Sequence, residues 1–161
     1  MNFIVVGCGG VGKSTLIHQI LNEQVKAEII GNKIKYKKFE SKIVPFLNFF
    51  EIMREDININ NSIANIIKEI IEERENQFDK NDQNEFIHCI IYCERGNRIN
   101  AEHLNQLLTL RKKYGANRLP IIIAYTNTEN DEDAEKAKNF INEILNKYNA
   151  KIYINILLKI Y

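Results

Sequence analysis

The distribution of hydrophobic and polar positions predicts that strands and helices alternate along this chain. Short apolar runs are typical of buried strands, and apolar residues that recur every three or four positions are typical of helices. The strands are expected at residues 2–6, 42–50, 86–93, 120–126 and 151–157. The helices are expected to begin near Lys13 and Ser62 and to span 101–114 and 131–148. This order predicts an α/β protein with a mostly parallel sheet, covered by helices on both faces.

Two stretches of the pattern carry finer expectations. Residues 25–42 are polar and rich in lysine, and the alternation in 33–39 predicts an exposed edge strand, with Pro45 near the start of the strand that follows. The helix after Lys13 should bury one apolar face. That face is expected to contain Leu16, Ile17, Ile20 and Leu21.

Composition and charge narrow the class of protein. The chain has 161 residues, 45% of them hydrophobic and 27% charged, as expected of one globular domain over residues 1–161. A formal net charge of +1 gives no argument for nucleic acid as a partner. No apolar stretch reaches the roughly 18–20 residues of a transmembrane segment, and residues 1–7 do not resemble a secretory signal. We therefore expect a cytoplasmic protein with no transmembrane segment.

One short stretch carries a specific chemical motif. Of the seven glycines in the chain, four fall between positions 7 and 12, in the segment GCGGVGKST that follows the first predicted strand. This segment matches the phosphate loop G-x-x-x-x-G-K-[ST], in which backbone N–H groups surround a phosphate at a helix N-terminus. The expected phosphate-binding residues are Gly7, Gly9, Gly10, Val11, Gly12, Lys13, Ser14 and Thr15.

Two side chains of this loop have distinct expected roles. Lys13 should reach the β- and γ-phosphates of a nucleotide, and the Ser14 hydroxyl should bind Mg²⁺. Cys8 occupies a variable position of the loop, where we expect it to be a filler. Cys89 and Cys93 lie four residues apart on one predicted strand, about 13 Å, so they cannot share a metal ion.

With these motifs in place, the chain resembles the translation-factor-related P-loop GTPases, especially the Era- and septin-like branch. The resemblance rests on FIVVGCGGVGKSTLIHQIL at the start and on the segment from 90 to 127. It implies a three-layer P-loop NTPase fold of the Ras type, lacking the final helix, with Mg²⁺ and GTP or GDP as ligands. The missing helix leaves an apolar face that a homodimer or another protein partner would cover.

The base-reading motif of this family, [NT]-K-x-D, is half kept. The corresponding stretch TNTE places Thr126 and Asn127 at the first two positions and Glu129 at the position of the Asp. A carboxylate here would accept hydrogen bonds from guanine, and Asp131 is a second candidate. The alternative interpretation is that these acidic residues stabilise the N-terminus of the helix that follows.

The switch motifs of the family are degraded. Glu51 stands where the family has the Asp of D-x-x-G, and Arg54 replaces its Gly. Between Val25 and Pro45 there is no Thr, and Ser41 is the only hydroxyl besides Tyr36. Lys13 and Glu51 are therefore the expected catalytic residues of any surviving GTPase activity.

Three functions remain open at this point. The first is a guanine-nucleotide-binding protein whose GTP hydrolysis is slow or absent. The second is a pseudo-GTPase interaction module, with residues 33–42 as its partner surface, and the third is an ATP-using P-loop kinase. Arg95 and Arg98 follow a central strand and are candidates for phosphate or partner contacts, although an exposed turn is the simpler interpretation.

Overall fold

The fold was analysed in a computed structural model of the chain, which describes residues 1–53, 62–77, 86–95, 100–115, 119–126, 135–136, 139 and 142–143. The elements in chain order are β1 (Asn2–Val6), α1 (Lys13–Leu21), β2 (Glu28–Ile30), β3 (Tyr36–Glu40), β4 (Asn48–Ile52), α2 (Ile63–Gln77), β5 (Ile87–Arg95), α3 (Ala101–Tyr114) and β6 (Ile121–Thr126). The helix and strand expected at 131–148 and 151–157 lie largely or wholly outside the described residues, as does any final helix.

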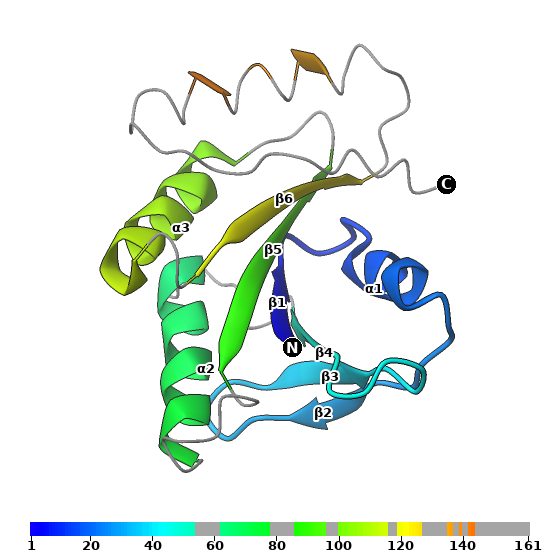
Figure 1. Cartoon of the computed structure of the whole chain (residues 1–161). Helices are drawn as coiled ribbons and strands as arrows, with labels where there is room; N and C mark the ends of the chain where they lie inside the picture. The colour runs from blue at the N-terminus through cyan, green and yellow to red at the C-terminus, as the bar shows by residue number, and fades with distance from the viewer. Residues whose placement is uncertain are drawn as a thin grey trace.

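The strands form one six-stranded sheet in the order β2-β3-β4-β1-β5-β6. Strands β4, β1, β5 and β6 run parallel to one another, whereas β2 and β3 pair antiparallel at one side of the sheet. Helix α1 covers one face, and α2 and α3 lie side by side on the other (Figure 1). The expected α/β architecture of three layers with a mostly parallel sheet is confirmed.

Each face of the sheet has its own hydrophobic core, because successive strand residues point to opposite sides. In β1, Ile4 and Val6 pack toward α2 and α3, whereas Val5 packs toward α1. The apolar stripe of α2 is fully buried, as its spacing predicts. It consists of Ile63, Ile66, Ile67, Ile70 and Ile71.

Helix α1 buries less than its sequence predicts. Leu16, Ile17 and Leu21 are buried, but Ile20 is 43% exposed, so its assignment to the buried face is wrong. The physical reason is that the helix has only nine residues and contacts the sheet through a narrow apolar stripe. Ile20 lies outside that stripe.

The strands before β4 also differ from the prediction. The strand predicted from the alternation in residues 33–39 is β3, which lies between β2 and β4, so β2 and not β3 is the edge strand on this side of the sheet. The strand expected at 42–50 begins only at Asn48 and continues to Ile52. Pro45 lies in the preceding turn, where Ser41 Oγ accepts hydrogen bonds from the N–H groups of Ile43 and Val44. Among the described residues, no helix has the length and apolar content of a membrane-spanning segment.

Candidate functional site: a phosphate loop at the carboxyl edge of the sheet

The candidate site lies where the parallel strands end. The phosphate loop connects the end of β1 to the start of α1, and the neighbouring strands end beside it with Glu51 on β4, Glu94 on β5 and Thr126 on β6. Ligands of open α/β sheets bind at this carboxyl edge, because the connecting loops diverge there. The sheet order therefore places three distant segments of the chain around one loop.

The backbone of the loop needs glycine at both of the fixed glycine positions of the motif. Gly7 passes so close to β5 that an added Cβ would overlap with the carbonyl oxygen of Cys93. Gly12 has φ 82° and ψ 22°, a left-handed conformation directly before the first residue of α1. Side chains rarely adopt this conformation, so the turn into the helix depends on glycine.

Lys13 is folded over the loop and is only 5% exposed. Its Nζ donates hydrogen bonds to the carbonyl oxygens of Gly7 at 3.0 Å and Cys8 at 3.1 Å. Burial lowers the pKa of Lys13 below its usual range, and the nearby carboxylate of Glu51 opposes part of that shift. A largely buried ammonium group therefore stands beside the loop, where a phosphate would compensate its charge.

Ser14 and Glu51 are brought together by the fold. The Ser14 hydroxyl donates a hydrogen bond of 2.6 Å to Glu51 Oε2, although the two residues are 37 positions apart. Glu51 is 7% exposed and is the fourth residue of β4, which pairs with β1 on the side away from β5. A hydroxyl and a carboxylate are oxygen ligands of the kind that Mg²⁺ prefers, so the donor set fits this ion.

Thr126 anchors the loop from behind. It is fully buried at the end of β6, and its hydroxyl donates to the carbonyl oxygen of Val11, with the Glu94 carbonyl 3.3 Å away. Thr126 is the first of the residues expected to contact the base. Its hydroxyl is engaged by the loop backbone. Asn127, Glu129, Asp131, Arg54 and Arg98 lie outside the described residues.

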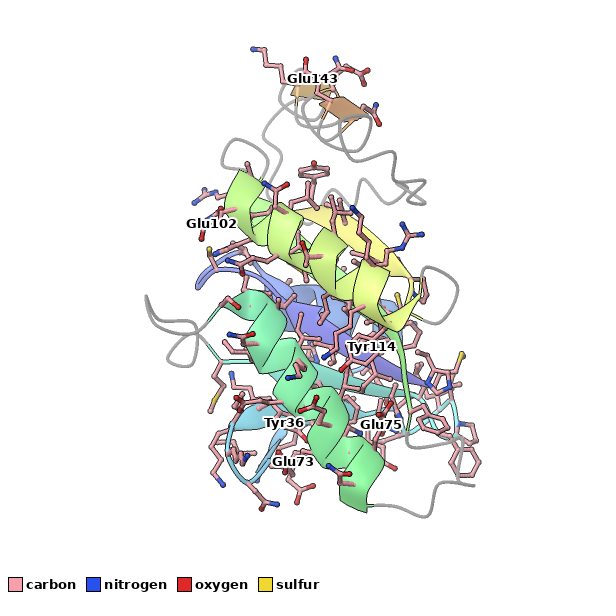
Figure 2. All side chains as sticks on the ribbon, turned by 90° about the vertical axis from the view of Figure 1, so that its left-hand side faces the viewer. Tyr36, Glu73, Glu75, Glu102, Tyr114 and Glu143 are labelled. Carbon is pink, nitrogen blue, oxygen red and sulfur yellow. The ribbon has the colours of Figure 1, made fainter. Side chains whose placement is uncertain are left out.

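A cavity of about 600 Å³ opens beside the phosphate loop. Residues 8–11 line one side of it, and the end of β5 and the first turn of α3 line the other. Figure 2 shows Glu102 at this end of α3. Arg95 lines the cavity and is exposed, but it is the last residue of β5 and does not follow the strand as expected.

The sequence interpretation did not identify Glu94 as part of this site. Glu94 is 2% exposed and accepts a hydrogen bond from the Tyr92 hydroxyl. Burial raises the pKa of Glu94 above its usual range, and the Tyr92 hydroxyl acts in the opposite direction. The sequence feature that indicates Glu94 is a carboxylate directly after an apolar run typical of a central strand.

These features together define a phosphate-loop nucleotide-binding fold: a central parallel strand, a glycine loop, and a helix whose first residues are Lys and Ser. The strand order and the antiparallel β2–β3 pair at one side of the sheet then narrow the choice among phosphate-loop folds. The chain has the fold of a P-loop GTPase G domain, as comparison with solved structures shows.

Three solved structures illustrate that likeness. A bacterial selenocysteine-specific elongation factor, EF-Sec, matches with TM-score 0.57 and 16% identity over 96% of this chain and 25% of that chain. The septin GTPase domain from Chlamydomonas reinhardtii matches with TM-score 0.59 and 14% identity over 99% and 64%. An ADP-ribosylation-factor-like GTP-binding protein, the small COPII coat GTPase SAR1 from Encephalitozoon cuniculi in complex with GDP, matches with TM-score 0.55 and 12% identity over 94% and 61%.

The chain thus spans between a quarter and about two thirds of the length of these structures. At identities of 16% and below, the likeness concerns the fold. Comparison with protein-family profiles and with curated proteins found no match.

Proposed function

We propose that this chain binds guanine nucleotides, GTP and GDP, together with Mg²⁺, and hydrolyses GTP slowly or not at all. The observation that carries the proposal is the phosphate loop itself, with Lys13 folded over it and Ser14 held 2.6 Å from the buried Glu51. The choice of nucleotide is supported by the fold, since the SAR1 structure that shares it is a complex with GDP.

The residues of the loop would bind the phosphates in two ways. The N-terminus of α1 offers backbone N–H groups without helical partners, including those of Ser14 and Thr15, and the helix dipole favours a negative charge there. Lys13 Nζ would exchange its bonds to the Gly7 and Cys8 carbonyls for bonds to phosphate oxygens. Both contributions are made in the ground state, so they serve binding whether or not hydrolysis follows.

Ser14 and Glu51 are the residues that would hold Mg²⁺. The ion would neutralise charge on the phosphates, which is the chemistry that it supplies in phosphoryl transfer. The Glu51 carboxylate accepts a hydrogen bond from the Ser14 hydroxyl, and this bond holds the carboxylate beside the loop. In this proposal Lys13 and Glu51 are also the residues on which any residual catalysis depends.

The first switch segment contains no Thr, and its only Ser lies away from this site, which is why we propose slow or absent hydrolysis. Ser41 follows β3 at the end where Glu40 pairs with Asn48 of β4, roughly 10 Å along the strand from Glu51. Its Oγ accepts from two N–H groups of its own turn and donates to Glu23. Ser41 therefore stabilises a turn at the opposite edge of the sheet from the phosphate loop.

Base recognition remains part of the proposal and rests on the segment after β6. Thr126 fixes the start of this segment against Val11 of the loop. From there Asn127 and Glu129 would contact the base, with the carboxylate accepting from guanine. The side chain of Glu129 is longer than that of Asp by one methylene group, and Asn127 replaces the usual Lys. Both differences should weaken the preference for guanine without abolishing it.

Calorimetric titration of the purified chain with GTP, GDP and ATP, with and without Mg²⁺, tests this proposal. Binding of GTP and GDP but not ATP supports it, whereas binding of ATP alone would favour the kinase interpretation. Lys13→Ala should weaken GDP binding roughly 10- to 100-fold, because it removes charge-assisted hydrogen bonds to phosphate. The matched control is Lys26→Ala, which removes an exposed lysine away from the loop and should bind GDP like the unchanged chain.

A turnover assay separates the binding protein from the pseudo-GTPase module. Phosphate release from GTP at the rate of the uncatalysed reaction, together with GDP binding, would identify a nucleotide-binding protein without enzymatic function. No heat with any nucleotide would leave only an interaction module. Release that is fast and abolished by Glu51→Gln would contradict slow hydrolysis.

Two further expectations belong to this proposal. A cytoplasmic location agrees with the buried thiols, since burial raises the pKa of Cys89 to about 11 and that of Cys93 to about 12, which leaves them unreactive. A homodimer or a complex with another protein is also part of this proposal. Light scattering tests it, and a monodisperse monomer would contradict the homodimer.

A further inference from the structure

Three potential metal ligands converge where the phosphate loop, β5 and α3 meet. The Sγ atom of Cys8, a carboxylate oxygen of Glu94 and a ring nitrogen of His103 all lie within 4.8 Å of one another. The three residues come from separate elements, so their convergence is a product of the tertiary structure. This cluster is distinct from the Ser14 and Glu51 pair, which lies on the β4 side of the loop.

Each of the three ligands is positioned by its own element. Cys8 is exposed in the first turn of the phosphate loop, directly after the close passage of Gly7 along β5. Glu94 is the last buried residue of β5. His103 lies in the first turn of α3, where the Asn100 side chain accepts hydrogen bonds from the backbone N–H groups of Glu102 and His103.

The ligand set indicates which ion would bind. A thiolate, an imidazole and a carboxylate together are typical of zinc, whereas Mg²⁺ and Ca²⁺ prefer oxygen ligands alone. Tetrahedral zinc ligands at about 2.0–2.3 Å from the ion lie roughly 3.3–3.8 Å apart. The cluster therefore needs to contract by roughly 1 Å, which the exposed side chain of Cys8 can supply by a small change of rotamer.

The surroundings of the cluster resemble the outer shell of a metal site. The Tyr92 hydroxyl donates to Glu94 Oε1 and lies 3.4 Å from His103 Nδ1, so it fixes the orientation of both ligands. The backbone N–H groups of Asn100 and Arg95 also donate hydrogen bonds to the Glu94 carboxylate and help to hold it in place. Such hydrogen bonds from a second layer of residues orient the ligands and tune the affinity for metal.

The charge of Glu94 also points to a cation. Its carboxylate is 2% exposed, and no cationic side chain among the described residues forms an ion pair with it. A buried carboxylate without a counter-charge is costly, and a bound metal ion supplies that charge. The cavity of about 600 Å³ beside Cys8 and Glu94 gives the ion an entry path and leaves room for a water ligand.

We propose that Cys8, Glu94 and His103 bind one zinc ion, with water or another small ligand at the fourth position. The ion joins the phosphate loop to β5 and α3. This site does not depend on the proposed nucleotide function, because none of the three ligands is needed to bind phosphate through its side chain.

Titration of the full chain with Zn²⁺ alone, in competition with a chromophoric chelator, tests the site. The titration is made without nucleotide and in excess Mg²⁺, which occupies oxygen-ligand sites. We expect one Zn²⁺ per chain, and a loss of affinity of at least about 10-fold in each of Cys8→Ser, Glu94→Gln and His103→Gln. The matched controls Glu102→Gln, on the same turn of α3, and His18→Gln, on α1, should stay within about twofold of the unchanged chain.

A second measurement reports directly on the thiolate ligand. Co²⁺ bound in place of Zn²⁺ should give a thiolate-to-cobalt charge-transfer absorption that Cys8→Ser lacks and that Glu102→Gln keeps. Cys89 and Cys93 are buried and cannot substitute for Cys8. Absence of stoichiometric Zn²⁺ binding, equal affinity in the three ligand variants, or a cobalt band that survives Cys8→Ser would each overturn the proposal.

Discussion

At the scale of single residues, the shape of the phosphate loop depends on partners that are distant in sequence. Thr126 is 115 positions from Val11, yet its hydroxyl donates to the Val11 carbonyl oxygen inside the protein. Without that donor, a buried carbonyl would lose its hydrogen bond, and such losses cost about 1–3 kcal/mol. The loop is therefore held by β6 as well as by its own glycines.

We predict that Thr126→Val lowers the free energy of unfolding by about 1–3 kcal/mol, because Val keeps the shape but removes the hydroxyl. Nucleotide affinity should fall as well, since the carbonyl of Val11 is no longer fixed. Urea unfolding measures the first effect and calorimetric titration the second. Thr126→Ser is the control, because it retains the hydroxyl. If it lowers the free energy of unfolding as much as Thr126→Val does, this explanation is contradicted.

His88 gives the protein a predicted dependence of stability on pH. Burial lowers the pKa of His88 below its usual value, and the positive N-terminus acts in the same direction. The unfolded chain therefore binds more protons than the folded chain just below the ordinary pKa of about 6.5. Stability from this group is present above that pH and is lost as the pH falls through the folded-state pKa.

The structural basis is the hydrogen bond that His88 Nδ1 accepts from the backbone N–H of Asn2, which protonation removes. We predict that the urea midpoint of the unchanged chain decreases when the pH is lowered from about 7.5 to about 5.5. The decrease should be smaller in His88→Gln. Comparison of the two proteins at both pH values isolates this group from other titrating residues. An equal fall in both would exclude His88 as the cause.

At the scale of elements, α2 shows how far local sequence determines structure. The helix is expected to begin near Ser62, and the Ser62 Oγ accepts a hydrogen bond of 3.2 Å from the N–H of Asn65. The helix ends at Gln77, after fifteen residues. Capping and periodicity involve neighbours within one or two turns, which is why the sequence predicts them well.

We predict that Ser62→Ala destabilises the protein by about 0.5–2 kcal/mol, because it leaves a donor at the helix N-terminus without its partner. The measurement is the free energy of unfolding from urea denaturation. Ser62→Asp retains an acceptor at the same position and should be close to the unchanged chain. If Ser62→Asp lowers the free energy of unfolding as much as Ser62→Ala does, then Ser62 does not stabilise the protein by capping.

The strands were predicted less completely than the helices. The apolar runs of β1, β5 and β6 identify them, since a strand buried on both faces needs no alternation. The boundaries of β4 and the place of β3 could not be predicted, because pairing partners and not local pattern decide them. Sequence alone does not state that Glu40 pairs with Asn48.

At the scale of the whole molecule, nucleotide binding should be coupled to stability. A ligand that binds only the folded chain stabilises it by about 2.7 kcal/mol at 100 times its dissociation constant. We predict that GDP with Mg²⁺ at this concentration raises the melting temperature by about 5–10 °C, since each 1 kcal/mol shifts it by about 2–4 °C for a chain of this size. Thermal unfolding followed by fluorescence or circular dichroism gives the shift.

The same experiment contains its own controls. ATP at equal concentration should raise the melting temperature less than GDP does, and Lys13→Ala should lose most of the GDP effect. Stabilisation by ATP equal to that by GDP would contradict the proposed choice of base. A shift that Lys13→Ala retains would mean that the nucleotide binds elsewhere.

The sequence by itself determined the phosphate loop, the helices and the buried strands, because glycine spacing, caps and periodicity act between neighbours in the chain. It also indicated Ser14 and Glu51 separately, through a motif and a resemblance. The tertiary structure decided that these two residues meet, that Thr126 fastens Val11, and that Cys8 approaches Glu94 and His103. These contacts depend on the order of strands in the sheet, which brings distant segments to one edge and is set by packing of the whole chain.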